Sequence, residues 1–198
     1  MNLSEKEIYI ILKEKLPNLS QKDIESFLNI TTYHNLNKNT IILKSGIKTK
    51  KAFLILNGTV RGYITSEYSV EKNILIRSDG IFVADTRKLF ANDSQRIAFK
   101  SIGESHILLF NYNDFEALAK SNPAIMNLYL NILKEAITRL TYRIESLTTM
   151  THEEQYKDIL KLNPTFLKNT HAKYLADYLG ITAEALSRIM KRVKNEKS

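Results

Sequence analysis

Six polar side chains near the C-terminus have the types and spacing best suited to binding chemistry. An arginine can form two parallel hydrogen bonds with guanine, a glutamate can accept a hydrogen bond from the cytosine amino group, and a lysine can neutralise a phosphate. At helical spacing, side chains of these types could reach base edges and phosphates along a DNA groove. The candidate DNA contacts are Thr182, Glu184, Ser187, Arg188, Lys191 and Arg192.

The segment that must position these side chains, residues 170–194, reads as two helices joined by a tight turn. Gly180 can adopt the left-handed backbone angle that ends the first helix, and Thr182 can cap the second. Ala176 is small where the two helices must approach closely. Apolar residues repeat along the second helix at Ala185, Leu186, Ile189, Met190 and Val193. The pattern predicts a helix-turn-helix whose second helix lies in the major groove; the alternative is an ordinary helical hairpin with a solvated basic edge.

The sequence offers little else that could carry chemistry. It contains no cysteine, which excludes disulfides and thiolate metal sites. It has no glycine-rich phosphate loop, serine nucleophile motif or recognisable carboxylate pair. A cupin-like metalloenzyme could share a β-roll but would need clustered ligands within its strands, where His106 stands alone. None of the four histidines has metal-ligand spacing: His34, His106, His152 and His171. We therefore expect no catalytic residue, no metal, no cofactor and no enzymatic activity.

The overall charge favours a polyanionic partner. The chain of 198 residues carries 29 Lys and Arg against 21 Asp and Glu, a net charge of +8. No apolar run approaches the roughly 18 residues that a membrane-spanning helix needs. The first residues lack the apolar stretch and cleavage site of a signal peptide. We expect a cytoplasmic protein without a membrane partner.

The first 120 residues are expected to form two short helices followed by a β-domain. Ser4 and Glu7 form a capping box for a helix over residues 4–16, and Ser20 can start a second helix. Asn57-Gly58 between two apolar runs is a strong hairpin signal. Short strands separated by Gly, Asn and Asp turns indicate a sandwich, roll or barrel. The expected strands are 40–43, 52–56, 60–64, 73–76, 81–84, 96–100 and 107–110.

A long helix is expected to follow Asn122-Pro123. Its apolar residues include Ile125, Leu128, Tyr129, Ile132, Leu133, Ala136, Leu140, Ile144 and Leu147. Several of these positions lie seven or eight residues apart, which is typical of a coiled-coil seam. We favour a homodimer seam because a protein that reads a palindrome needs two copies; the alternative is a helix buried on its own roll. Residues 148–151 are the expected hinge, and Thr151 can cap a further helix that ends before Pro164.

The order of these elements resembles the Crp-Fnr superfamily of cyclic-AMP-receptor-like transcription regulators. The most specific match is YLADYLGITAEALSRIMKRVK, with its Ser187-Arg188-Ile189 step. The resemblance implies an α+β fold with an N-terminal β-roll of the cyclic-nucleotide-binding jelly-roll type, a long dimerisation helix and a C-terminal helix-turn-helix. It also implies that Glu184 and Arg188 read bases. Ala183 stands where the family usually has a basic residue, so the DNA sequence read is expected to differ.

The ligand cassette of this family is degenerate here. Members that bind cyclic nucleotides carry Gly-Glu and then an Arg-Ser/Thr pair, with the Glu on the ribose and the Arg on the phosphate. In this sequence Gly80 has no Glu partner, Ala84 or Asp85 occupies that region, and Ile97 follows Arg96 in place of a hydroxyl residue. We predict that cyclic AMP does not bind tightly. Arg96 is the single candidate for binding an anionic effector, the alternative being a strand-edge salt bridge.

These patterns divide the chain into a sensor-like β-roll with N-terminal helices (1–120), a dimerisation helix and hinge (121–150) and a DNA-binding unit (151–198). The expected function is a sequence-specific DNA-binding regulator of transcription, acting as a homodimer on a palindromic operator. Its expected partners are double-stranded DNA, a second copy and RNA polymerase, and a small effector in the roll could gate it. The alternative is a small-molecule-binding or cyclic-nucleotide-binding module whose helical tail docks onto a protein partner.

Overall fold

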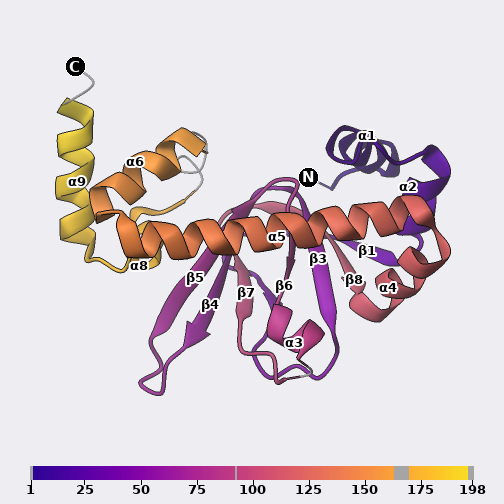
Figure 1. Ribbon diagram of the computed structural model, residues 1–198, viewed down its shortest axis with the longest axis horizontal. Helices are drawn as coiled ribbons and strands as arrows, with labels where there is room; N and C mark the ends of the chain where they lie inside the picture. Colours follow the sequence, from indigo (N-terminus) through magenta and orange to yellow (C-terminus); the bar gives the residue numbers. More distant parts are fainter. Residues whose placement is uncertain (1, 92, 163–169, 196–198) are drawn as a thin grey trace.

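The computed structural model describes residues 2–91, 93–162 and 170–195 of the chain. It has the expected α+β fold, a β-roll crossed by one long helix, α5 (Figure 1). Helices α1, α2 and α4 lie near one end of α5, and α6, α8 and α9 lie at the other. None of the described helices is long and apolar enough to span a membrane. The helices are α1 Glu5–Lys15, α2 Gln21–Leu28, α3 Thr86–Phe90, α4 Tyr112–Ser121, α5 Pro123–Thr149, α6 His152–Leu162, α8 Ala172–Leu179 and α9 Ala183–Asn195.

Two four-stranded antiparallel sheets form the roll, in the orders β1-β8-β3-β6 and β2-β7-β4-β5. The seven expected strands are present with small shifts at their ends. The sequence did not indicate β1, whose residues TTYHNL include few large apolar side chains and which is paired along its whole length with β8. The strands are β1 Thr31–Leu36, β2 Ile41–Leu43, β3 Lys51–Asn57, β4 Thr59–Thr65, β5 Glu71–Ser78, β6 Phe82–Ala84, β7 Ala98–Ser101 and β8 Ser105–Asn111.

The prediction of a hairpin at Asn57-Gly58 is wrong. Strands β3 and β4 belong to different sheets, so the chain turns a corner there instead of pairing the two strands. Gly58 has φ of +104°, and a Cβ added to it would lie 2.7 Å from the Glu104 carbonyl oxygen. Its N–H donates to the side chain of Asp79 at 2.8 Å. Both strands are buried along most of their length, and their long-range partners outweigh the local turn preference.

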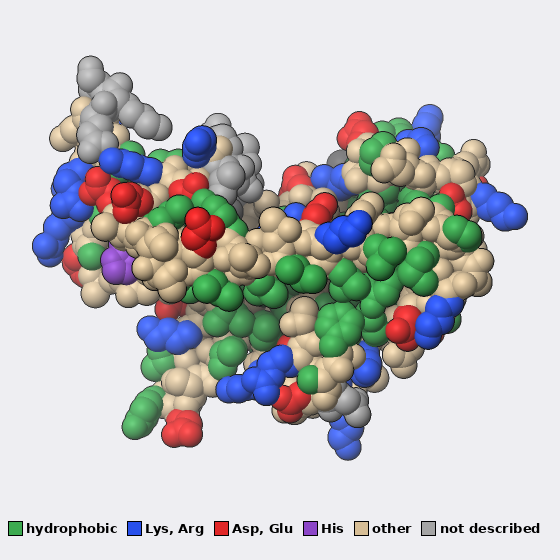
Figure 2. Space-filling model, in the orientation of Figure 1, with side chains coloured by type: hydrophobic (Ala, Val, Ile, Leu, Met, Phe, Trp, Pro, Cys, Tyr) green, Lys and Arg blue, Asp and Glu red, His purple; other side chains and the backbone are tan. Residues whose placement is uncertain are grey.

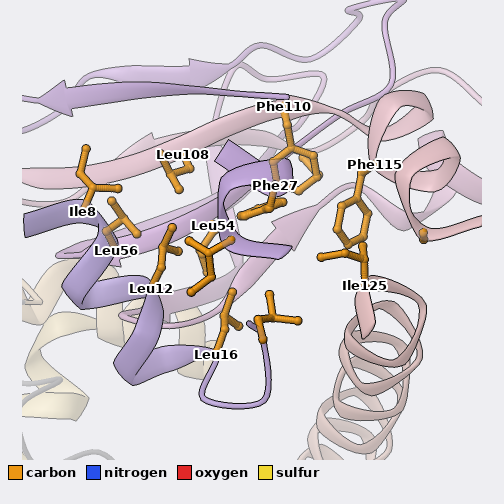
Figure 3. Close-up of a cluster of buried hydrophobic side chains, with 14 residues drawn as sticks. Ile8, Leu12, Leu16, Phe27, Leu54, Leu56, Leu108, Phe110, Phe115 and Ile125 are labelled. Carbon is orange, nitrogen blue, oxygen red and sulfur yellow. The ribbon is translucent and has the colours of Figure 1, made fainter. Parts of the chain in front are cut away.

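The main core lies between the N-terminal helices, one sheet and the start of α5 (Figure 3). Helix α1 begins with the predicted capping box at Ser4. Helix α2 also begins with a capping box, at Ser20, where the sequence predicted only a helix start. Phe27 is fully buried, and its ring contacts those of Phe110 and Phe115 at centroid distances of 5.6 and 5.9 Å. Ile125, in the first turn of α5, is fully buried in the same cluster, which attaches the start of α5 to the roll.

Helix α5 begins as expected, with Asn122 capping and Pro123 at the first position. Ile125, near its start, is fully buried in the core of its own chain, so it is not available for the expected intermolecular seam; Ile132 is partly buried against the same core. From Leu130 onward, α5 carries a largely exposed apolar stripe with alternating spacings of three and four residues. The stripe includes Leu130 and Ile137, which the sequence reading omitted. Its members are Leu130, Leu133, Ile137, Leu140, Ile144 and Leu147, of which all but the half-buried Leu133 are exposed; we call them the α5 stripe.

The helix cap predicted at Thr151 is present. Helix α5 ends at Thr149, and Thr151 then caps α6: its hydroxyl accepts from the Glu154 N–H at 3.3 Å. The Glu154 carboxylate accepts in return from the Thr151 N–H at 2.8 Å. Pro164, expected to end this helix, lies outside the described residues, as do Phe166 and Leu167, which lead toward the helix-turn-helix.

Candidate nucleic-acid interface

Helices α8 and α9 form the two arms of a helix-turn-helix, and the turn between them has the predicted geometry. Gly180 is left-handed, with φ of +75° and ψ of 23°. The Ile181 N–H donates to the Ala176 carbonyl at 3.0 Å, which closes the end of α8. The Thr182 hydroxyl accepts from the Ala185 N–H at 3.2 Å and caps α9. Each of these contacts is local, which is why the sequence was enough to predict them.

The inner face of α9 is buried against α8, α6 and the roll. Leu186 is fully buried, and Ile189 and Val193 are nearly so. They join Leu175 and Leu179 of α8, together with side chains from the roll, in one cluster. Met190 was expected on this inner face but is 37% exposed. Three side chains already fill the space against α8, which leaves Met190 at the edge of the packed face.

The outer face of α9 carries the six candidate DNA contacts, and all of them are exposed. Figure 2 shows Lys and Arg side chains along the outer edge of α9, with acidic side chains beside them. The backbone N–H of Glu184 and the Thr182 side chain lower the pKa of the Glu184 carboxyl group. Arg188 and Lys191 project from the middle of this face, where the major groove of DNA would lie.

Arg192 differs from the other candidates because it is engaged within the chain. Its Nε donates to the Glu153 carboxylate of α6 at 2.8 Å, and Lys157 also pairs with Glu153 at 3.1 Å. This arrangement ties the C-terminal part of α9 to α6. Arg192 is therefore less available for base contact than Arg188. Sequence reasoning could not find this pair, since Glu153 and Arg192 are far apart in the chain.

A second set of contacts, which the sequence did not indicate, holds α8 on the roll. The Asp177 carboxylate accepts from the backbone N–H of Asn73 in β5 at 2.6 Å and pairs with Lys72 at 3.5 Å. The Asn73 side chain donates to the Tyr174 carbonyl at 3.3 Å. The buried Arg61 guanidinium stacks over the Tyr174 ring at 4.7 Å. These contacts fix the orientation of the helix-turn-helix relative to the roll.

The stretch compared with the ligand cassette contains a carboxylate that is hydrogen-bonded within the chain. Asp85 is buried and accepts from the backbone N–H groups of Arg87, Lys88, Arg96 and Ile97 at 3.1, 3.4, 2.8 and 3.0 Å. Its negative charge takes up donors that an anion would otherwise use. The side chain of Arg96, the candidate effector residue, is exposed and does not line the cavity next to this segment.

No metal site is formed within residues 2–91, 93–162 and 170–195, where His, Cys, Asp and Glu form no group of three or more suited to a metal. His106, the one strand histidine considered as a ligand, instead has its Nδ1 in a hydrogen bond of 2.7 Å with the Tyr33 hydroxyl.

No protein-family model and no curated protein sequence matches this chain. Solved structures do. FixK2 from Bradyrhizobium japonicum matches with a TM-score of 0.70 and 16% identity, over 85% of this chain and 86% of its own. The c-di-GMP-responsive regulator CLP from Xanthomonas campestris matches with a TM-score of 0.68 and 16% identity, over 90% of this chain and 93% of its own.

A third match is a protein from Eubacterium rectale assigned to the crp/fnr family of transcriptional regulators. Its TM-score is 0.67 and its identity 15%, over 96% of this chain and 89% of its own. At these identities the likeness concerns the fold, and it extends from the roll through α5 to the helix-turn-helix. The chain therefore has the fold of the Crp/Fnr transcriptional regulators.

Proposed function

We propose that the protein is a transcription regulator of the Crp-Fnr type that binds a specific DNA sequence through α9. The observation that carries this proposal is the division of α9 into two faces. Leu186, Ile189 and Val193 anchor one face, while the opposite face presents Glu184, Ser187, Arg188 and Lys191 to solvent. A rigid helix with exposed base-reading side chains is the form that a recognition helix takes.

The roles of these side chains follow from their positions. Glu184 lies in the first turn of α9, where a recognition helix approaches base edges. Arg188 lies one turn further and can pair with guanine through two hydrogen bonds, whereas Lys191 is suited to a phosphate. Thr182, at the helix N-terminus, can contact the DNA backbone in addition to its capping role. Arg192 contributes to DNA binding by contacting a phosphate while its Nε stays hydrogen-bonded to Glu153.

The α5 stripe supports a homodimer. Its spacings of three and four residues are those of a coiled-coil seam, and its exposed Leu and Ile side chains would be buried by a second copy of α5. Two copies related by a two-fold axis would present two α9 helices about 34 Å apart, to successive major grooves of a palindrome. Such a regulator would act in the cytoplasm, with RNA polymerase as a further partner.

Selection of bound fragments from random DNA tests this proposal most directly. The natural chain is expected to enrich a palindrome with half-sites separated by about one helical turn. Arg188→Ala is expected to weaken binding to that palindrome by about 1–3 kcal/mol and to relax base preference at one position of each half-site.

Lys191→Ala should instead weaken binding to all sequences alike and reduce the salt dependence. Arg87→Ala is the matched control, because Arg87 is an exposed arginine on α3 that pairs with Asp93. Enrichment of no sequence, or an unchanged consensus with Arg188→Ala, would refute the proposal.

A further inference from the structure

A cavity of about 340 Å³ lies between the roll and α5. Its walls come from β3, β5, β6, β8, α3, α4 and α5, and one residue, Tyr178, comes from α8 of the helix-turn-helix. In Figure 2, hydrophobic side chains line the edge of α5 that faces the roll and continue below it toward α3. The volume is within the range of small-molecule sites in proteins.

Most of the cavity wall is apolar. Aromatic rings form much of it, among them the buried Phe115 and Tyr112, the partly buried Phe82 and the exposed Phe90. Phe90 is exposed, and its ring contacts Tyr112 edge-on at a centroid distance of 5.8 Å. A wall of this kind favours a hydrocarbon or aromatic body over the hydroxyl-rich ribose of a nucleotide.

The charged lining residues are three arginines and one glutamate, Arg77, Arg139, Arg143 and Glu135. Glu135 pairs with Arg139 at 2.6 Å. Arg143 donates to the Tyr178 carbonyl at 2.6 Å and stacks over the Tyr178 ring at 4.2 Å. One carboxylate among three guanidinium groups leaves this part of the cavity with a surplus of positive charge.

Arg77 has only neutral hydrogen-bond partners among the described residues. Its Nη1 donates to the carbonyl of Ile76 at 2.9 Å, and no acidic side chain of the described residues forms an ion pair with it. Burial, with repulsion from Arg139 and Arg143, lowers the pKa of Arg77 despite a hydrogen bond to Tyr178. A partly buried guanidinium in such surroundings is stabilised by a bound anion.

We propose that this cavity binds a small amphiphilic monocarboxylate, with its apolar body against the aromatic wall and its carboxylate on Arg77, Arg139 and Arg143; its role as effector rests on the function proposed above. A phosphate at the cassette itself is disfavoured because Asp85 already occupies those backbone donors. A carboxylate offsets part of this surplus positive charge, since one glutamate already stands among the three arginines.

The test is calorimetric titration of the full chain with the saturated fatty acids octanoate, decanoate and dodecanoate. At least one is expected to saturate a single site per chain, and decan-1-ol, which lacks the charge, is expected to bind at least about tenfold more weakly than decanoate. Arg77→Met, which keeps an unbranched side chain, should weaken fatty-acid binding by about tenfold or more. Arg87→Met, an exposed arginine outside the cavity, is the control and should leave it unchanged.

Ala136→Phe provides a second test, because Ala136 lines the cavity and a larger side chain would fill it without removing charge. It should abolish binding while circular dichroism shows retained secondary structure. The proposal is overturned if none of the three acids binds, if decan-1-ol binds as well as decanoate, or if cyclic AMP displaces the acid with higher affinity. Sequence selection on DNA is measured without these ligands, so failure here leaves the DNA-binding proposal to its own test.

Discussion

Replacing Ile137 by serine is expected to weaken the association of two chains by about two orders of magnitude. Ile137 lies in the middle of the α5 stripe and is 63% exposed in the single chain. Fully burying an isoleucine side chain stabilises by about 1.5–3 kcal/mol. The exposed part is therefore worth about 1–2 kcal/mol per chain, or about 2–4 kcal/mol for the two copies of a dimer. At 1.4 kcal/mol per factor of ten, that is roughly 30- to 700-fold in the dissociation constant.

Sedimentation equilibrium over a concentration series measures this change. Ile10→Ser is the matched control, because Ile10 is an isoleucine on α1 that is 46% exposed and lies outside the α5 stripe. The control is expected to associate as the natural chain does, and both variants should keep the helical content seen by circular dichroism, since neither side chain is buried in the single chain.

Two results would refute the reasoning. The first is a natural chain that sediments as a monomer at every concentration used for DNA binding. The second is a dissociation constant for Ile137→Ser within about threefold of the control, which would mean that the α5 stripe is covered by something other than a second copy of α5.

Three further outcomes are expected. Leu186→Ala should lower the free energy of unfolding by about 2–5 kcal/mol in urea titration, because Leu186 is fully buried between α9 and α8; a loss below about 1 kcal/mol would contradict that packing. Asp177→Ala should speed amide hydrogen exchange at Asn73 by about tenfold or more, since it removes the charged acceptor of that N–H; unchanged exchange would show that α8 is not held there. Hydrogen bonds from the Thr151 backbone and hydroxyl lower the pKa of Glu154 in the folded chain. The ionised Glu154 therefore stabilises the fold above the pKa that this group has in the unfolded chain, and this stabilisation is lost as pH falls through the lowered folded-state pKa. Thermal melts of Glu154→Gln across the acid range should lack this part of the pH dependence, and an unchanged profile would contradict the assignment.

The features that the sequence predicted well are those specified by short-range chemistry. Ser4 with Glu7, Asn122 with Pro123, and Gly180 with Thr182 each fix a helix end through contacts a few residues apart. The two-faced pattern of α9 is likewise local, because the period of a helix places its own side chains. These signals were enough to indicate the helix-turn-helix and the candidate base contacts.

Other features depend on partners far away in the chain. Asn57-Gly58 has the composition of a hairpin turn, yet β3 and β4 belong to different sheets. Strand β3 pairs with β8 and β6, and β4 pairs with β7 and β5. The apolar period of α5 was visible in the sequence, but only the tertiary structure separated the side chains that pack in the core, such as Ile125, from those of the α5 stripe. Periodicity alone does not say which apolar face meets its own domain and which is left for a partner.

The same distinction holds for charge. The sequence predicted Arg192 as one of six equivalent DNA contacts, whereas the tertiary structure pairs it with Glu153. The sequence also predicted Arg96 as the effector-binding residue, but its side chain lies outside the cavity. The tertiary structure also brings Arg77 of β5 together with Arg139 and Arg143 of α5 around one apolar cavity. Residue types and local spacing determined which side chains each helix can present on each of its faces. The availability of a charged group was decided only by folding, because electrostatic interactions act through space and not along the chain.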